Sequence, residues 1–445
     1  MKKILTFAFI LLIYSSCDKN LDIEPQQAIS TDIALSDEQG IRTALIGTYD
    51  LLSQLPRSSG DIILNTKLFA DTEDVFWTGF FIPLTQVLDK NIATDNTAIE
   101  NYWVYSYRTI NQANTVLNAI KGINDVDLEA ISAELRFIRA MVYFDLINMF
   151  AQPWTSNDPM TQLGVPIVVT PAEISLANPE VPRSSVFEVY EFIVEDLLFA
   201  KSNLPVQNGV FANTFTASAL LSRVYLMQEE FELATNEADR IISSGNYTLQ
   251  NNLEDLFNQS TNSSEDIFSI QSTQQDYENR VSHFYSGELE GGGGFIGITD
   301  EHLDKYESGD LRATLFYQDR QSGTRRSSKW KVNDSNDGNV TTIRLAEIYL
   351  TRAEGRYHTG DVEGSLRDLN IIRNRAGLSA LNELNLDAIL EERYLELIFE
   401  GHQFRDAKRC RKMFGDVPFD DPRMVYPIPQ REMDINRALI QNEGY

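Results

Sequence analysis

Residues 343–378 read IRLAEIYLTRAEGRYHTGDVEGSLRDLNIIRNRAGL, and this stretch decides the fold. Apolar and small residues recur there at steps of three and four, which places them on one face of each of two helices. These residues are Ile343, Ala346, Leu350, Ala353 and Tyr357 in the first helix, and Leu366, Leu369, Ile372 and Ala376 in the second. Gly360 ends the first helix, Asp361 caps the second, and Gly377 supplies the left-handed residue at which the second stops. Small side chains at Ala353 and Ser365 favour a close approach of the two helices.

One such helix pair has two apolar faces and cannot bury both alone, so related pairs must pack beside it. The chain supplies a second pair at Ser218–Ser244, which Gly245 ends, and amphipathic helices at Glu134–Phe150 and Arg183–Leu204. This spacing is typical of tetratricopeptide-like repeats, and an ordinary helical bundle is the alternative. On either interpretation the sequence predicts a mainly α scaffold.

The segment Asp255–Thr342, called the excursion below, differs in composition from the helical segments. It is rich in Ser, Asn, Gln and Gly and contains the run Gly291–Gly294. Its aromatic residues argue against disorder, so we expect a folded, loop-rich departure from the helices. Residues 17–445 then form a single domain, with a mostly helical part (17–254), the excursion (255–342), and a helical C-terminal part (343–445). Residues 61–95 show no sustained helical period, and Tyr426–Pro429 is expected to lie extended on the surface.

Charge and cysteine content exclude several classes of protein. The formal net charge is −27, and such a surface repels nucleic acid and anionic lipid headgroups. The chain has 2 cysteines, Cys17 and Cys410, so a disulfide framework is absent.

Residues 1–16 are expected to be a targeting segment. Lys2 and Lys3 give a basic start, Ile4–Ile13 an apolar core, and Ser15-Ser16 the small residues before Cys17. This arrangement predicts a lipoprotein signal peptide, with Cys17 as the lipidated first residue of the mature chain and acyl chains as its membrane anchor. Plain secretion is the alternative, because Tyr14 replaces the usual aliphatic residue.

Aromatic residues in loops are the candidates for a binding site. Trp77, Phe80 and Phe81 flank Gly79, and the acceptor Asp74 precedes them; Tyr277, Tyr285 and Trp330 are further candidates in the excursion. A ring can cover the apolar face of a sugar while the hydroxyl rim keeps its hydrogen bonds. If each ring removes ~50 Å² of apolar surface, it contributes roughly 1 kcal/mol, so a few rings predict μM to mM affinity. The alternative is that these aromatics belong to the core, as we expect for Trp103 in its helical stripe.

Signatures of catalysis are missing. No G-x-S-x-G elbow, H-E-x-x-H zinc helix or G-x-x-x-x-G-K-[ST] phosphate loop occurs, and the histidines are scattered. Asp71, Glu73 and Asp74 crowd one loop, whereas a glycosidase needs two carboxylates on opposite sides of a bond, ~5–9.5 Å apart. We expect a protein that is not an enzyme and uses no metal or cofactor. A secreted glycoside hydrolase and a pure assembly scaffold are the alternatives.

Short motifs in a fixed order carry a family resemblance over essentially the whole chain. They are Trp103-x-x-x-Tyr107-x-x-Ile110-x-x-Ala113-Asn114, Glu134–Leu146, Asp310-Leu311-Arg312, Arg344–Glu354, Glu392–Arg409, and the terminal Tyr426–Pro429 with Asn442-x-Gly444-Tyr445. Together they resemble the SusD/RagB family, the nutrient-binding outer-membrane lipoproteins of Bacteroidetes. Gln403 stands where an arginine or a similar residue is usual in that family.

The resemblance implies a fold and a partner. The fold would be a SusD-like scaffold of tetratricopeptide-like helix pairs packed against an irregular, loop-rich half. The partner would be a SusC-like TonB-dependent outer-membrane transporter, with this protein as a lid over the barrel mouth at the cell surface. The expected ligand is an oligosaccharide, and a peptide is the alternative because the family includes peptide binders. The matched motifs belong mainly to the scaffold, so the candidate site residues come from the loops.

Overall fold

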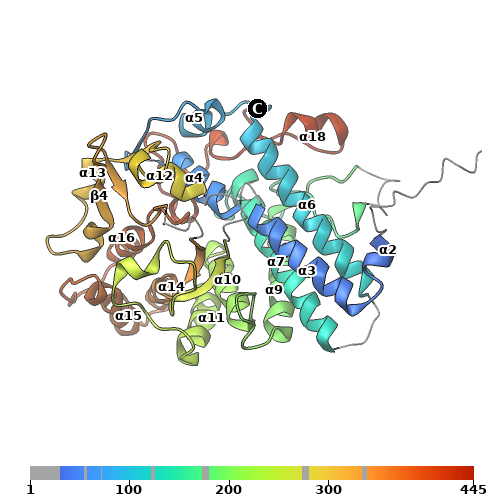
Figure 1. The fold of residues 1–445 in the computed structure, drawn as a ribbon, viewed down its shortest axis with the longest axis horizontal. Coiled ribbons are helices and arrows are strands. Elements are labelled where there is room, and N and C mark those ends of the chain that lie inside the picture. The colour runs from blue at the N-terminus through green and yellow to red at the C-terminus, as the bar shows by residue number, and fades with distance from the viewer. Residues whose placement is uncertain are drawn as a thin grey trace, which may run out of the picture.

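Helices form one continuous stack, and the loop-rich segment lies on one side of it (Figure 1). The computed structural model describes residues 31–54, 58–71, 73–121, 126–172, 180–272, 280–332 and 338–445. The helices in these residues are α2 (Thr31–Ala34), α3 (Glu38–Gln54), α4 (Ser58–Phe69), α5 (Ile82–Leu88), α6 (Thr97–Ala119), α7 (Val126–Phe150), α9 (Val186–Asn203), α10 (Thr214–Met227), α11 (Phe231–Ser244), α12 (Arg280–Tyr285), α13 (Asp300–Leu303), α14 (Leu345–His358), α15 (Val362–Arg375), α16 (Leu386–Leu397), α17 (Gln403–Arg409) and α18 (Gln430–Ile435). The strands are β1 (Val75–Trp77), β2 (Asp266–Ile270), β3 (Ile296–Ile298), β4 (Phe316–Gln318), β5 (Arg325–Ser327) and β6 (Val340–Arg344), which pair antiparallel as β1–β3, β2–β6 and β4–β5.

The helix pair α14–α15 has the turn that the sequence predicted. The Asp361 side chain accepts a hydrogen bond from the Gly364 N–H at 2.9 Å and so caps α15. At the other end Gly377 has a φ of +79°, and the Leu378 N–H donates to the Arg373 carbonyl at 2.9 Å. This is the left-handed helix stop that the glycine allows.

The two helices approach closely where small side chains were expected. Ser365 Oγ donates to the Ala353 carbonyl at 2.5 Å, a contact that a larger residue at either position would block. The facing stripes form one buried cluster with residues of α16: Ala346, Leu350, Ala353, Leu369, Ile372, Ile389 and Leu397. The prediction that Ile343 begins the first helix is wrong, because Ile343 lies in β6. The run Val340-Thr341-Thr342-Ile343 is β-branched and favours a strand, so α14 begins at Leu345.

A series of helices continues the stack from α14. α11 packs on α14, α10 on α11, α9 on α10, and α7 on α9, with α3 and α6 against α7 at the far end (Figure 1). Each neighbour buries an apolar face that its own pair leaves open. The fold is therefore mainly helical and tetratricopeptide-like, as predicted, although α7 begins earlier than expected, at Val126.

Two segments differ from the sequence-based expectations because they are buried on more than one side. In α4 the apolar Ile63 and Leu64 and the polar Asn65 and Lys67 are all buried, so no apolar stripe with helical period marks this helix. The C-terminal tail is also buried: the Tyr426 N–H donates to the Met149 carbonyl at 2.7 Å, and its side chain packs in the core. The predicted surface position of Tyr426–Pro429 is therefore wrong.

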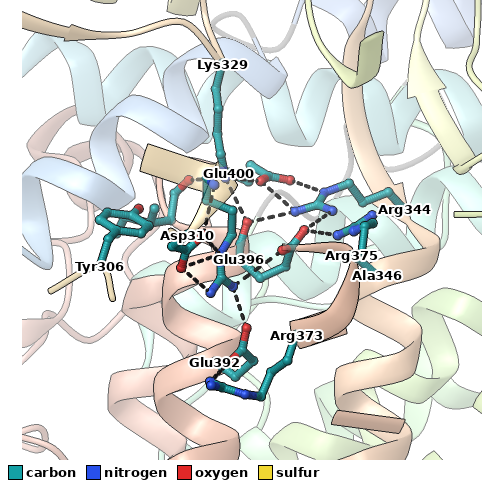
Figure 2. Close-up of polar contacts among 12 residues, drawn as sticks. Tyr306, Asp310, Lys329, Arg344, Ala346, Arg373, Arg375, Glu392, Glu396 and Glu400 are labelled. Carbon is teal, nitrogen blue, oxygen red and sulfur yellow. Dashed lines mark hydrogen bonds and ion pairs between the residues drawn. The ribbon is translucent and has the colours of Figure 1, made fainter. Parts of the chain in front are cut away.

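Buried ion pairs fasten the excursion to the C-terminal helices (Figure 2). Lys329 donates to Glu400 at 2.7 Å and also to the carbonyls of Glu396 and Ile398. Arg344, at the end of β6, donates to both Glu396 and Glu400 at 2.6 Å. Truncating one partner of such a buried pair costs about 3–5 kcal/mol, because the other charge is left unpaired. The excursion is therefore a folded part of the structure, as predicted, and is held by these ion pairs together with its strand pairings and its buried apolar residues.

Candidate functional site

Strands β1 and β3 bring the loop around Gly79 against the end of the glycine run of the excursion. Val75 lies opposite Ile298 and Trp77 opposite Ile296 in this antiparallel pair. The pairing continues beyond the strands, since the Thr78 N–H donates to the Phe295 carbonyl at 2.9 Å. Two loops that are distant in the sequence therefore share one framework.

Aromatic rings gather at this junction and are called the ring cluster below. Its members are Trp77, Phe80, Phe81, Phe284 and Phe295. Trp77 stacks on Phe284 with centroids 5.8 Å apart and an interplanar angle of 19°, and Phe80 stacks on Phe81 at 4.8 Å and 20°. The Phe295 ring lies edge-on to the Phe80 and Phe81 rings, at 6.0 and 5.3 Å. Pairs in these geometries contribute about 0.5–1.5 kcal/mol beyond the burial of their surface.

The ring cluster is graded from buried to exposed. Phe284 is buried at its base, Trp77, Phe81 and Phe295 are half-buried, and Phe80 is 78% exposed at its outer edge. The neighbouring Ile82 is exposed as well. Exposed apolar residues that adjoin one another, unlike single scattered ones, indicate a surface for interaction.

Glycine makes this arrangement possible at two positions. A Cβ atom at Gly79 would lie 2.1 Å from the Trp77 indole, so only glycine lets the ring fold over the chain there. A Cβ atom at Gly297 of β3 would likewise lie 2.1 Å from the ring of Phe76, which is paired with it across the strands. The indole is oriented further by its own N–H, which donates to Thr85 Oγ1 at 3.2 Å.

Asp74 lies at the start of β1 and anchors the strand instead of reaching the surface. Its carboxylate is buried and surrounded by Lys67, His302, Lys305, Tyr394 and Gln403. Lys67 donates to one oxygen at 2.7 Å and Lys305 to the other at 2.5 Å. Burial alone would raise the pKa of this carboxyl, but the hydrogen bond with His302 and the charge of Lys67 hold that pKa well below its ordinary value. The prediction that Asp74 accepts a hydrogen bond from a ligand is corrected, because both of its oxygens are engaged inside the protein.

The candidates from the excursion do not join the ring cluster. Trp330 is 1% exposed and its indole N–H donates to the Phe399 carbonyl at 2.6 Å, so it is a core residue. Tyr285 is fully buried, with its ring 5.6 Å from that of Phe399. Both are withdrawn from the candidate site, because a ligand at the surface cannot contact them. Tyr277 lies outside the described residues, as does Cys17. Trp103 is buried, as expected for the core.

Two members of the ring cluster were not predicted as site residues. Phe284 and Phe295 were noted only as aromatic residues that argue for order in the excursion. Phe295 directly follows the run Gly291–Gly294, and Phe80 directly follows Gly79. An aromatic residue after a flexible glycine was thus the signal that both loops share.

Two family models match the chain. A family described as starch-binding and associating with the outer membrane matches residues 19–226, and the SusD family matches residues 243–418. The chain belongs to the SusD family. The ring cluster of this family member draws residues from both matched regions, with Trp77 in the first and Phe295 in the second.

One relative and one solved structure of the SusD family match the chain over nearly its full length, and a starch-binding relative matches a shorter stretch. The chain is 24% identical to the SusD-like protein P38 of Formosa agariphila, with 100% of each chain covered. It is 30% identical over 124 residues to the starch-binding protein SusD of Bacteroides thetaiotaomicron, which is 24% of this chain and 22% of that one. A crystal structure of a SusD superfamily protein from Bacteroides thetaiotaomicron superposes with a TM-score of 0.79 at 25% identity, covering 93% of this chain and 100% of that one.

Proposed function

We propose that this SusD family member binds an oligosaccharide at the ring cluster, on the outer face of the outer membrane, and delivers it to a TonB-dependent transporter. The observation that carries the proposal is Phe80, a large aromatic side chain that is 78% exposed and supported from behind by the rest of the ring cluster. An apolar ring that is exposed to water forgoes the favourable free energy of burial. A ligand that covers the ring would supply that burial.

The chemistry of the ring cluster suits a neutral sugar. The face of Phe80 that does not stack on Phe81 can cover the apolar C–H face of a pyranose ring, while the sugar hydroxyls stay in water. Each covered ring contributes roughly 1 kcal/mol for ~50 Å² of apolar surface, so a small number of contacts gives affinities in the μM to mM range. Affinity of that order allows a captured glycan to be released to a transporter.

The location and the partner rest on the sequence and on the family. The family model that matches residues 19–226 is described as associating with the outer membrane. Acyl chains on Cys17 would supply the anchor, and within the described residues no helix combines the length and apolar character needed to cross a bilayer. On this proposal the transporter is a SusC-like barrel that the protein covers as a lid.

Capture without chemistry is the proposed mode of action. Of the acids that a glycosidase could have used, Asp74 is buried and ion-paired, which removes it as a general acid or nucleophile toward a surface ligand. The protein would act by binding alone, with the peptide ligand as the competing possibility.

A panel of soluble polysaccharides, oligosaccharides and short peptides tests the proposal. The purified protein is titrated with each by calorimetry, and the mixtures are then analysed for shortened products. We expect saturable binding of at least one glycan, no product, and weaker binding by Phe80→Ala. Product release would show an enzyme, and binding confined to peptides would overturn the glycan assignment. If the protein binds no member of the panel but still co-purifies with a transporter, an assembly scaffold would be favoured.

A further inference from the structure

A cavity of about 210 Å³ lies between α16 and α17 and shares no lining residue with the ring cluster. From α16 it is lined by Leu390, Arg393, Tyr394 and Leu397, and from α17 with its last turn by Gln403, Asp406, Ala407 and Cys410. Both sets follow the spacing i, i+3, i+4, i+7, which marks one face of a helix. Faces of this kind ordinarily pack against each other, and here they enclose a space instead.

The cavity has both apolar and polar side chains in its buried lining and lysines at its mouth. Leu397, Ile398 and Phe414 line it and are almost fully buried. Lys305 and Lys412 also line it but are exposed, as is Met413, so these residues lie at the mouth. A molecule that fills the cavity would therefore place an apolar body inside and a polar group outside.

Three polar side chains that line the cavity, Arg393, Asp406 and Tyr394, already have partners within the protein. Arg393 donates to Asp406 at 2.9 Å, and the other oxygen of Asp406 accepts a hydrogen bond from Arg409 at 2.8 Å. The Tyr394 hydroxyl donates to Asp74. A sugar inside would find few free partners for its hydroxyls, and unpaired buried hydroxyls are costly. The interior thus favours a hydrocarbon ring over a carbohydrate.

One lysine at the mouth selects the charge of the polar group. Lys305 is paired with the Asp74 carboxylate, while Lys67 pairs with both Asp74 and Asp71. Lys412 makes no ion pair with any residue that the structure describes, so on a chain of net charge −27 it presents a local positive charge that attracts an anion.

We propose that this cavity binds a small monocarboxylate whose apolar ring enters between α16 and α17 and whose carboxylate meets Lys412. The size fits, because an apolar cavity of about 150 Å³ accepts benzene and this one is larger. The site is separate from the ring cluster and does not depend on the proposed glycan binding.

Phenylacetate is the probe, and phenylacetamide, which has the same shape without the charge, is the matched ligand. The purified protein is titrated with each and binding is followed by saturation-transfer NMR and calorimetry. We expect saturable binding of phenylacetate and at least threefold weaker binding of phenylacetamide. Lys412→Ala should weaken phenylacetate binding about threefold to fivefold, the effect of one exposed charge pair, and Lys121→Ala, another exposed lysine, should not change it.

Filling the cavity gives the second arm of the test. Leu390→Trp should abolish phenylacetate binding while the circular dichroism spectrum and glycan binding stay unchanged, and Phe80→Ala should leave phenylacetate binding intact. If Leu390→Trp does not fold, the affinities of Lys412→Ala and Lys121→Ala for phenylacetate, and of the wild type for phenylacetamide, still test the proposal. Absence of saturable phenylacetate binding, equal affinity for phenylacetamide, or full affinity in Lys412→Ala would each overturn the proposal.

Discussion

Replacing Phe80 by alanine separates a ligand-binding role of the ring cluster from a structural one. Because 78% of Phe80 is exposed, the folded state loses little when the ring is removed: mainly its stacking on Phe81 at 4.8 Å, worth about 0.5–1.5 kcal/mol. A stacked sugar would lose ~50 Å² of apolar contact, or roughly 1 kcal/mol, which weakens binding about fivefold. Trp77→Ala separates the two roles less well, because Trp77 contacts Phe284 and bonds Thr85 and so supports the structure too.

The assay pairs affinity with stability. Calorimetric titration with the glycan that the wild-type protein binds gives the affinity, and a thermal melt followed by circular dichroism gives the stability. Phe211→Ala is the matched control, since Phe211 is another surface phenylalanine, which packs on Tyr49 away from the ring cluster. We expect Phe80→Ala to bind about fivefold more weakly and Phe211→Ala to bind like the wild type, with both variants folded.

Either of two results would refute the assignment of Phe80. Unchanged glycan affinity in Phe80→Ala would mean that the ligand lies elsewhere. A large drop in melting temperature would mean that the ring is structural despite its exposure.

Three further predictions concern the buried charges and the anchor. Glu396→Gln removes one of the two carboxylates that Arg344 and Arg375 share, the other being Glu265, and should lower the free energy of unfolding by about 3 kcal/mol in urea titrations. The exposed pair of Glu363 and Arg367 predicts at most about 0.5 kcal/mol for Glu363→Gln, and equal losses would contradict the role of the network. Because the folded-state pKa of Asp74 lies below its unfolded value of 3.8, its contribution is present above that pH and is lost below it. Asp74→Asn should therefore be less stable than the wild type at neutral pH, and the difference should narrow by about 1.4 kcal/mol per pH unit below 3.8; a difference that stays constant down to pH 2 would refute this. Cys17→Ala should lose incorporation of labelled palmitate and leave the membrane fraction, while Cys410→Ala should behave like the wild type; persistent labelling of the Cys17 variant would exclude the proposed anchor.

The scaffold could be predicted from the sequence because its information is local. Asp361, Gly377 and the small Ser365 act within a few residues of where they stand, so turn, stop and close approach are all visible in one stretch. α4 escaped prediction for the opposite reason. Elements distant in the sequence bury α4 on several sides, so its apolar residues show no helical periodicity that could be recognised in the sequence.

The candidate site was predicted in part, and there is a physical reason why some of its residues were predicted and others were not. Trp77, Phe80 and Phe81 lie in one loop next to a glycine, so their grouping could be inferred from the sequence alone. Phe284 and Phe295 join them only through the pairing of β1 with β3, which depends on contacts between distant segments. Trp330 and Tyr285 were assigned to the surface because composition marks a loop-rich segment without showing which of its side chains point inward.

The ion pairs of Figure 2 bear on how such proteins could exchange their loops. Lys329 belongs to the excursion and Arg344 follows it, while their carboxylate partners Glu396 and Glu400 belong to α16 and the turn after it. A chimaera that received the excursion of a relative without the matching carboxylates would bury unpaired charge at the graft. Recombination or design of new specificities in this chain should therefore transfer the excursion and residues 386–400 together, as one heritable unit.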